Sequence, residues 1–248
     1  MVGRLLEVTL GDPFSNLALE EVLFMELRVP ILRVWNNQKS VIIGRAQLAT
    51  SETDVEYCRG KSIPIVRRFT AGGTVYNGPG NLNWSFFVPR GADGTGAGLG
   101  DANRVFVSFA SQIVRALRAC HVDCEFEPPN GIFDRHGKIS GMAAYISKRG
   151  VLCHGTLLID ADLEEVEALT RPGAKELMRR YPRSKFAPVS NCRVKTRDFV
   201  SKLVEGSGYA LEEDRLTKTE SESTLDLTTS KYKDDGWNLG DPFSLDDF

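Results

Sequence analysis

Two arginines and a pair of glycines stand together in residues 67–76, which read Arg-Arg-Phe-Thr-Ala-Gly-Gly-Thr-Val-Tyr. Gly72 and Gly73 carry no Cβ, so their backbone amides can approach an anion closely. The guanidinium of Arg68 could form two parallel hydrogen bonds to a phosphate or carboxylate beside them. A tight turn with surface arginines would explain the same residues, because Gly-Gly is a common turn signal. The run matches neither the P-loop nor the dinucleotide-binding glycine pattern, so neither site is expected.

Three later stretches could place further polar groups beside that turn. Asn83 precedes an apolar run and could point its amide into a site, or it could simply be a turn residue. Lys138 begins a strand rich in small residues, where its ammonium could bridge two anionic groups. An ordinary surface lysine is the alternative. His154 lies within the apolar run Cys153–Leu158, where a histidine is more often a hydrogen-bonded core residue than a catalyst.

Short apolar runs separated by glycine, proline and asparagine predict the strands that must hold these groups. We expect strands at residues 4–10, 31–35, 40–43, 63–67, 74–77, 82–88, 132–133, 138–146 and 151–159. Helical spacing of apolar residues predicts helices at 13–28, 101–120 and 162–169, with further helical turns at 196–204 and within 216–233. Strand groups interrupted by a few helices are typical of an α+β fold with mixed, mostly antiparallel sheets flanked by helices.

Two segments are expected to be loops. Residues 91–100 contain five glycines in ten positions, which predicts a flexible connection. Residues 171–185 are basic, and they carry Arg171, Lys175, Arg179, Arg180, Arg183 and Lys185 against the single acid Glu176.

Composition excludes several classes of protein. The chain has 248 residues, 42% of them hydrophobic, and a formal net charge of −2, which indicates an ordinary globular protein rather than a disordered or fibrous one. No apolar run approaches the ~20 residues that a membrane span needs. The five cysteines form no C-x-x-C pair and the three histidines no metal-binding spacing. We therefore expect a cytoplasmic, single-domain protein with reduced cysteines, no metal site, and no membrane or nucleic-acid partner.

Charge is distributed unevenly along the chain. Residues 212–248 contain 11 acidic and 4 basic side chains, whereas residues 1–211 contain 22 acidic and 27 basic ones. A basic body with an acidic C-terminal segment could suit an anionic ligand. A solvated acidic tail explains the same numbers equally well.

Taken in order, the four stretches resemble the lipoate-protein ligase A family, within the biotin/lipoate ligase superfamily. That family carries the motifs R-R-x-S-G-G-G-x-V, G-N-x-N, K-x-S-G-x-A and H-H-G-T-L-L, which correspond to residues 67–75, 80–83, 138–143 and 153–158. Residues 14–21, 41–47 and 232–240 match it as well, so the resemblance covers essentially the whole chain. The departures are Ala71 for the first glycine, Asn77-Gly78 for His-Asp, Met142 for Ser and Cys153 for His.

The resemblance implies the superfamily's catalytic-domain fold and an ATP-dependent lipoate-protein ligase. Such an enzyme uses ATP and Mg²⁺ to convert lipoate to lipoyl-AMP. It then transfers the lipoyl group to a lysine of an E2 lipoyl domain of a 2-oxoacid dehydrogenase or of the glycine-cleavage H protein. Lys138 would be the catalytic residue, hydrogen-bonded to both the acyl carbonyl and the phosphate. The implied binding residues for ATP and lipoyl-AMP are Arg68, Gly72, Gly73, Thr74, Val75, Tyr76, Asn83, Lys138 and His154. The apolar tail would lie near Val75, Leu82 and Ile139, and the basic loop would close over the adenylate.

Two other functions remain open. An octanoyl or lipoyl transferase of the same fold would need a cysteine nucleophile and no ATP. Cys124 lies one position from where an ungapped comparison would place that cysteine. A non-catalytic subunit that binds lipoyl-AMP or a partner is the other alternative, although the presence of Lys138 and Arg68 argues against it.

Few residues follow the Trp-Asn-x-Gly motif near the C-terminus, and this bears on whether a second subunit is needed. Many ligases of this family carry an accessory domain after the Trp-Asn-x-Gly motif, and here only residues 241–248 follow Trp237–Gly240. We expect the accessory domain to be missing and a separate accessory subunit to support the activation step, with the acidic segment 212–248 as a docking edge.

Overall fold

The computed structural model describes residues 2–92, 101–170 and 181–242, and an eight-stranded sheet lies at its centre. Its strand order is β11-β1-β2-β6-β10-β9-β8-β7. The strands are β1 (Gly3–Glu7), β2 (Ile31–Trp35), β6 (Asn81–Pro89), β7 (Glu125–Glu127), β8 (Gly131–Phe133), β9 (Lys138–Ile146), β10 (Gly150–Leu158) and β11 (Leu211–Glu213). A second sheet has the order β4-β3-β5, with β3 at Ser40–Ile43, β4 at Ile65–Arg67 and β5 at Val75–Asn77.

Both sheets are mixed. The pairs β11–β1, β1–β2 and β3–β4 are parallel. The other pairs are antiparallel, including the long pairing of β10 with β6 and β9. The expected α+β fold with mixed, mostly antiparallel sheets flanked by helices is therefore confirmed.

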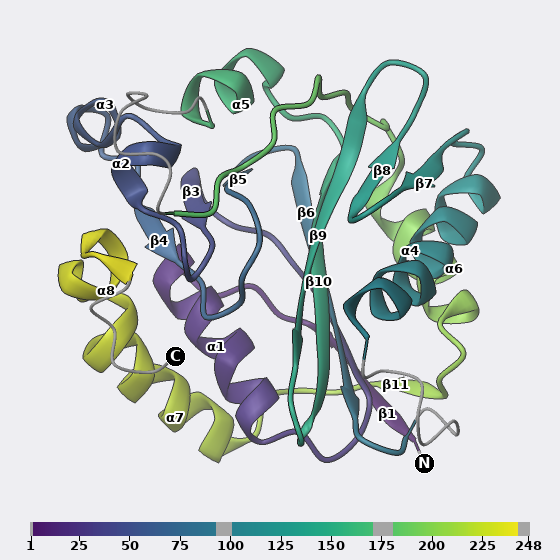
Figure 1. Cartoon of the computed structure of the whole chain (residues 1–248). Coiled ribbons are helices and arrows are strands. Elements are labelled where there is room, and N and C mark those ends of the chain that lie inside the picture. The colour runs from purple at the N-terminus through teal and green to yellow at the C-terminus, as the bar shows by residue number, and fades with distance from the viewer. Residues whose placement is uncertain (1, 93–100, 171–180, 243–248) are drawn as a thin grey trace.

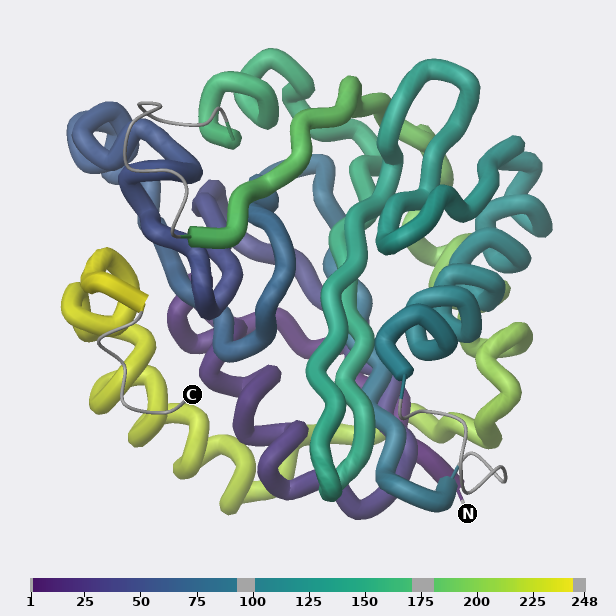
Figure 2. Tube along the Cα trace, in the orientation of Figure 1, coloured from purple at the N-terminus to yellow at the C-terminus, as the bar shows by residue number. Residues whose placement is uncertain are grey.

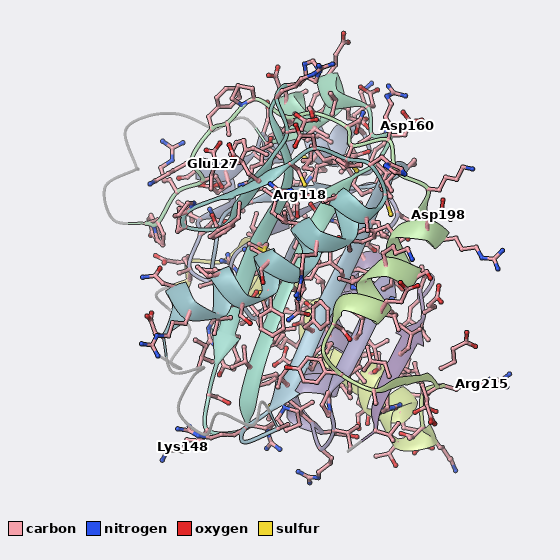
Figure 3. All side chains as sticks on the ribbon, turned by 90° about the vertical axis from the view of Figure 1, so that its right-hand side faces the viewer. Arg118, Glu127, Lys148, Asp160, Asp198 and Arg215 are labelled. Carbon is pink, nitrogen blue, oxygen red and sulfur yellow. The ribbon has the colours of Figure 1, made fainter. Side chains whose placement is uncertain are left out.

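Helices cover both faces of the large sheet (Figure 1). On one side lie α4 (Ala102–Ala119) and α6 (Thr196–Gly206), which Figure 3 shows packed side by side across the strands. On the other lie α1 (Pro13–Met25), the small sheet and the C-terminal helices. The remaining helices are α2 (Ala49–Glu52), α3 (Val55–Gly60), α5 (Leu163–Leu169), α7 (Lys218–Leu227), a π-helical turn at Thr228–Tyr232, and α8 (Asp235–Leu239). No helix in the described ranges is long and apolar enough to cross a membrane.

Successive side chains of β6 point to opposite faces of the large sheet, and their types decide which face carries the site. Trp84 and Phe86 point toward α4, where they join Phe109 in the largest hydrophobic cluster. The alternate residues of the strand, Asn83, Ser85 and Phe87, face α1, as strand geometry requires. Among those, Phe87 packs against α1, while Asn83 and Ser85 leave a polar strip on this face.

Several boundaries differ from those expected. The helix expected at 13–28 begins at Pro13, after Asp12, whose carboxylate accepts from the Ser15 amide, but it ends at Met25, ahead of Pro30. The strand expected at 4–10 ends at Glu7, because the backbone of Val8 and Leu10 is hydrogen-bonded by side chains of Arg33 and Asn16 instead. The sequence analysis also missed the short helices α2 and α3 and the edge strands β7 and β11.

The acidic C-terminal segment, as far as it is described, is part of the fold rather than a solvated tail. Figure 2 shows it running beside the N-terminal helix, and α7 packs along α1. Arg67 anchors its end, donating to the carbonyls of Trp237 at 2.6 Å and Gly240 at 3.0 Å. Residues 243–248 lie outside the described residues, as do 93–100 and the basic-loop residues Arg171, Lys175, Glu176, Arg179 and Arg180.

Candidate active site

A cavity of about 280 Å³, the main cavity, lies between the large sheet and the turn that follows β4. Strands β2, β6, β9 and β10 supply its floor, and residues 68–75 and 183–185 supply its other wall. A side cavity of about 110 Å³ opens next to it. Lys138, Thr74, Val75, Gly141, Thr156 and Lys185 line both.

Lys138 lies where the two cavities meet. Its backbone is fixed at the start of β9, because its amide donates to the Pro188 carbonyl at 2.7 Å and its carbonyl accepts from the Ser190 amide at 3.1 Å. Its side chain crosses Gly141, where a Cβ would lie 3.3 Å from both Cε and Nζ. Burial lowers the pKa of the Lys138 ammonium below its ordinary value. Within the described residues Nζ has no hydrogen-bond or ion-pair partner, so its donors are available to a ligand.

Arg68 organises the turn behind the main cavity. Its Nη2 donates to the carbonyls of Ala71 at 2.8 Å and Gly73 at 2.9 Å, and its Nε donates to Thr70 Oγ1 at 3.0 Å. Burial lowers the pKa of this guanidinium to about 10, so it stays charged at neutral pH. Arg68 therefore shapes the turn and contributes its positive charge to the cavity wall, although the turn's own oxygens occupy several of its donors.

The turn itself depends on glycine. Gly72 has φ +104°, a conformation that residues with a Cβ rarely adopt, and a Cβ there would lie 2.8 Å from Arg68 Nη2. Gly44 lies against it, since a Cβ on Gly44 would be 2.0 Å from the Gly72 carbonyl. The Thr74 amide already donates to Ser184 Oγ at 2.7 Å, so this amide of the implied binding residues is occupied.

The cavity floor offers unused polar atoms. Asn83 is only 3% exposed and lines the main cavity, and its Nδ2 has no hydrogen-bond partner among the described residues. A buried donor without a partner is costly, so a ligand acceptor at this position would be favoured. Thr156, on the neighbouring strand, faces the same space and pairs with Asn83 in the sheet register.

His154 closes a buried hydrogen-bond chain under the floor. Its Nε2 is 2.8 Å from Thr70 Oγ1, and its Nδ1 is 2.9 Å from Glu20 Oε2. Ser85 Oγ donates to the other Glu20 oxygen at 2.6 Å and accepts from Trp35 Nε1 at 3.1 Å. The sequence analysis proposed a hydrogen-bonded core histidine as the alternative for His154, and this geometry supports that interpretation while leaving one edge of the ring in the cavity wall.

The buried carboxylate of Glu20 remains ionised in this chain. Burial alone would raise its pKa, but the His154 ring, the Ser85 hydrogen bond and the Arg33 charge together hold it below its ordinary value. Arg33 is itself fully buried, with its pKa lowered to about 9 by burial. It donates to the Asn16 carbonyl at 2.8 Å.

Some implied residues lie elsewhere than expected. Tyr76 lines only the side cavity, and its hydroxyl donates to Glu165 at 2.9 Å. Leu82 and Ile139, expected beside the apolar tail, belong to the cluster under α4; Leu82 lines neither cavity, and Ile139 lines only the side cavity. Leu17, Trp35 and Ile42 provide the apolar lining with Val75 and Ala143 instead.

The cavity lining is strongly cationic. Arg68, Lys138, Arg183 and Lys185 line the main cavity, and none of its lining residues is acidic. The described residues contain no cluster of His, Cys, Asp and Glu that could hold a metal ion. This combination of apolar lining residues and positive charges suits an apolar acid joined to a phosphate.

Cysteine does not contribute to either cavity. Cys124, the candidate nucleophile, is 3% exposed in the cluster under α4. Burial raises its pKa to about 11, and burial likewise raises the pKa of Cys58, Cys120, Cys153 and Cys192. A reactive thiol needs the opposite shift, toward the thiolate.

Sequence reasoning missed several residues around the cavities. Glu20 and Gln47 fall inside stretches that carry the resemblance, but no role was assigned to them. Thr70 lies within the motif at residues 67–75 and Ser184 within the basic loop, yet neither was assigned a role, and Glu52 lies in no motif. The capping carboxylate of Asp54, which accepts from the Tyr57 amide, was the local signal that could have revealed α3.

Comparison with known proteins gives one consistent family. The family model described as "Lipoyl protein ligase A/B catalytic domain" matches residues 12–203. Lipoate–protein ligase 1 of Staphylococcus aureus is 30% identical over 240 residues, covering 92% of this chain and 70% of that protein. A chain from the structure of a bi-partite lipoate protein ligase and its E2 lipoyl domain from Thermoplasma acidophilum superposes with a TM-score of 0.84 at 26% identity, covering 97% of both chains. A crystal structure of lipoate-protein ligase A bound with ATP gives a TM-score of 0.82 at 27% identity, covering 97% of this chain and all of that one.

Proposed function

This chain belongs to the lipoyl protein ligase A/B catalytic-domain family, and from that premise we propose that it is an ATP-dependent lipoate-protein ligase. The observation that carries the proposal is the position of Lys138. Its ammonium, which has no partner among the residues that the structure describes, lies where a cavity with an apolar part to its lining meets a second one, among the charges of Arg68, Arg183 and Lys185. An acyl-adenylate has this same composition: an apolar acyl chain and a nucleoside, joined through a phosphate.

The first step forms the adenylate. A carboxylate oxygen of lipoate attacks the α-phosphorus of ATP, the bond to the β-phosphate bridging oxygen breaks, and pyrophosphate leaves with the electron pair. Negative charge develops on the oxygens around phosphorus. Lys138 and the turn organised by Arg68 stabilise it in a site that is already polarised for that charge.

The second step transfers the lipoyl group. The amine of an acceptor lysine attacks the acyl carbon, loses a proton as the amide forms, and AMP leaves with the electrons of the acyl–oxygen bond. Lys138 can donate to both the carbonyl oxygen and the phosphate, so one residue serves both steps. The proposed binding residues are Arg68, Gly72, Gly73, Thr74, Val75, Tyr76, Asn83 and His154. Two of them act indirectly: Gly72 by shaping the turn, and His154 by supporting the cavity floor.

Magnesium is proposed to accompany the nucleotide. Mg²⁺ is commonly held by substrate phosphates with only one or two protein carboxylates. Coordination of this kind is compatible with a cavity lined by cations, because the phosphate oxygens of ATP are themselves the negatively charged ligands of Mg²⁺.

The acceptor is proposed to be an E2 lipoyl domain, with the H protein as the other candidate. The Thermoplasma acidophilum ligase, whose described partner is its E2 lipoyl domain, supports the first choice. We also propose a cytoplasmic location for the chain as a single catalytic domain, since five unpaired cysteines suit a reducing compartment.

A separate accessory subunit is proposed for the activation step. This chain matches 97% of the chain from the bi-partite Thermoplasma acidophilum ligase but only 70% of the Staphylococcus aureus ligase. In length it therefore resembles one part of a two-part ligase, which supports the proposal. On this proposal the chain alone transfers lipoyl from supplied lipoyl-AMP but activates lipoate poorly.

The decisive experiment follows the acceptor by intact mass. The chain is incubated with an E2 lipoyl domain and either lipoyl-AMP or lipoate, ATP and Mg²⁺, with and without the second component of the Thermoplasma acidophilum ligase. Lipoylation from lipoyl-AMP by the chain alone is expected, with ATP-driven lipoylation appearing on addition of the second component. Rapid ATP-driven lipoylation by the chain alone would remove the two-subunit proposal only. No lipoylation from either donor, with or without that component, would contradict the ligase proposal.

A cysteine-dependent transferase of the same fold is the second candidate. No observation favours it, because the thiols line neither cavity and burial raises their pKa values. It would also be revealed in the same assay as acyl transfer from a carrier thioester without ATP.

A further inference from the structure

Glu52 is a buried carboxylate beside the main cavity to which no step of the proposed reaction assigns a role. It is the last residue of the four-residue helix α2, and it is 2% exposed. Ionised carboxylates are rarely this buried unless several donors satisfy them. The identity of those donors therefore indicates what the residue does.

The donors to Glu52 come from both sides of the cavity wall. Thr74 Oγ1, in the glycine turn, donates to Oε2 at 2.9 Å. The Ser184 amide lies 3.2 Å and 3.3 Å from the two carboxylate oxygens, and the Ser184 hydroxyl donates to Oε2. Arg183 Nε lies 3.9 Å from Oε1 as an ion pair. One carboxylate thus joins the turn to residues 183–184, which are far away in the sequence.

The Ser184 hydroxyl completes the junction. While donating to Glu52, it accepts from the Thr74 amide at 2.7 Å and from Gln47 Nε2 at 3.1 Å. Gln47 Oε1 in turn accepts from the Gly44 amide at 2.8 Å, and it lies 3.0 Å from Thr74 Oγ1, whose single hydrogen it shares with Glu52. Donors and acceptors are matched around this hydroxyl, which fixes its position relative to the turn.

The neighbours of Ser184 explain why that position matters. Arg183 and Lys185 both line the main cavity, and Lys185 also lines the side cavity. Neither belongs to a helix or a strand, so no backbone ladder holds them in place. Arg183 also donates to the Ser51 carbonyl at 3.0 Å. Glu52 is the carboxylate that contacts both Arg183 and Ser184 in this segment.

We propose that Glu52 is a positioning residue for the phosphate-bearing half of the adenylate. It holds residues 183–185 against Thr74 and so keeps two cations at the cavity. The floor that faces an acyl chain, on β2, β6 and β10, has no hydrogen bond to Glu52. Loss of the carboxylate therefore weakens binding of lipoyl-AMP while leaving the binding of lipoate alone nearly unchanged. This inference rests on the proposed function for the identity of the ligand.

The charge of Glu52 matters as well as its shape. Every partner named above presents a donor hydrogen to it, and a carboxylate has acceptor sites only. In Glu52→Gln one terminal atom becomes an NH₂ group that faces those donors. The nearly isosteric variant is therefore expected to disrupt the junction, whereas Glu52→Asp keeps the acceptors and restores part of the function.

The test measures equilibrium binding by calorimetry, separately for lipoyl-AMP and for lipoate. In Glu52→Gln we expect the dissociation constant of lipoyl-AMP to rise about tenfold or more. That of lipoate should change less than twofold, and Glu52→Asp should fall between wild type and Glu52→Gln. Ser184→Ala, which removes the shared hydroxyl from a less buried position, should show the same selectivity and replaces Glu52→Gln if that variant does not fold.

Glu220→Gln is the matched control. Glu220 is 4% exposed, pairs with Arg4 at 2.5 Å and caps α7, away from both cavities. This variant should lose stability while both dissociation constants stay the same. Equal loss of both ligands in Glu52→Gln, or no loss of lipoyl-AMP, would overturn the inference.

The inference and the proposed function fail in different ways. A wild type that binds lipoyl-AMP but transfers nothing to an acceptor would overturn the function, while the binding comparison would still decide the role of Glu52. A wild type that binds neither lipoate nor lipoyl-AMP would overturn both.

Discussion

His154 Nδ1 lies 2.9 Å from Glu20 Oε2, although the two residues are 134 positions apart in the sequence. The contact joins strand β10 to helix α1 beneath the floor of the main cavity. On the other side of the ring, Thr70 links His154 to Arg68 and so to the glycine turn. The wall and the floor of the site are thus held by one continuous chain of buried hydrogen bonds.

The Glu20–His154 pair should make part of the stability depend on pH. Because the folded-state pKa of Glu20 is lowered, the carboxylate stabilises the fold above its unfolded pKa of about 4.3, and this contribution is lost as pH falls through the folded value. Glu20→Gln should therefore be less stable than wild type at neutral pH, with a difference that shrinks on acidification. Urea unfolding of both proteins from pH 7 down to pH 3 measures this, and a difference independent of pH would contradict it.

Lys138→Ala should abolish both adenylation and transfer without unfolding the protein. Loss of one electrostatic contact to a developing charge commonly slows a reaction by about 100-fold or more. The control is Lys148→Ala, an exposed lysine that Figure 3 places at the tip of the β9–β10 hairpin, and it should leave both rates unchanged. Lipoylation by Lys138→Ala at a rate near wild type would remove the central residue of the proposed function.

Cys124→Ser should leave lipoylation largely unchanged. The proposed route passes through an adenylate and needs no thiol, and the buried Cys124 thiol has its pKa raised to about 11. Because a serine hydroxyl buried there could cost stability, Cys124→Ala is measured beside it, well below both melting temperatures. A thioester on Cys124 detected by mass spectrometry, or loss of activity in both variants, would favour the transferase instead.

Arg67→Ala should destabilise the protein through the C-terminal segment. The Arg67 guanidinium donates to carbonyls at Arg45, Gln47, Trp237, Asn238 and Gly240, and it is fully buried. Leaving several buried carbonyls without a donor should lower the free energy of unfolding by about 3 kcal/mol or more. Urea denaturation measures the change, with the peripheral Arg215→Ala as the control (Figure 3). Equal unfolding midpoints for the two variants would show that α8 does not depend on Arg67.

Local signals in the sequence determined much of the secondary structure. Strands β2 and β3 agree with residues 31–35 and 40–43, and α4 starts after its cap Asp101, because alternation and capping act within a few residues. The family was also identified from the sequence, since its four motifs keep their order and separation. The predicted end of the first strand was wrong, because side chains distant in the sequence hydrogen-bond the backbone of Val8 and Leu10.

Only the tertiary structure could assign roles to the neighbours Arg67 and Arg68. Adjacent residues leaving a strand point to opposite sides, so one of the two had to face away from the site, and the alternation alone does not say which. Pairing of β4 with β3 directs Arg68 to the glycine turn and Arg67 to the C-terminal segment.

The buried polar contacts of the site were also decided by the tertiary structure. Glu20 reaches His154, and Glu52 reaches Ser184 across 132 positions. Contacts of such separation leave no periodic trace in the sequence, because they form only when independent elements dock. The sequence alone therefore determined which elements form and which groups could do the chemistry, whereas their docking decided which buried charges hold those groups in place.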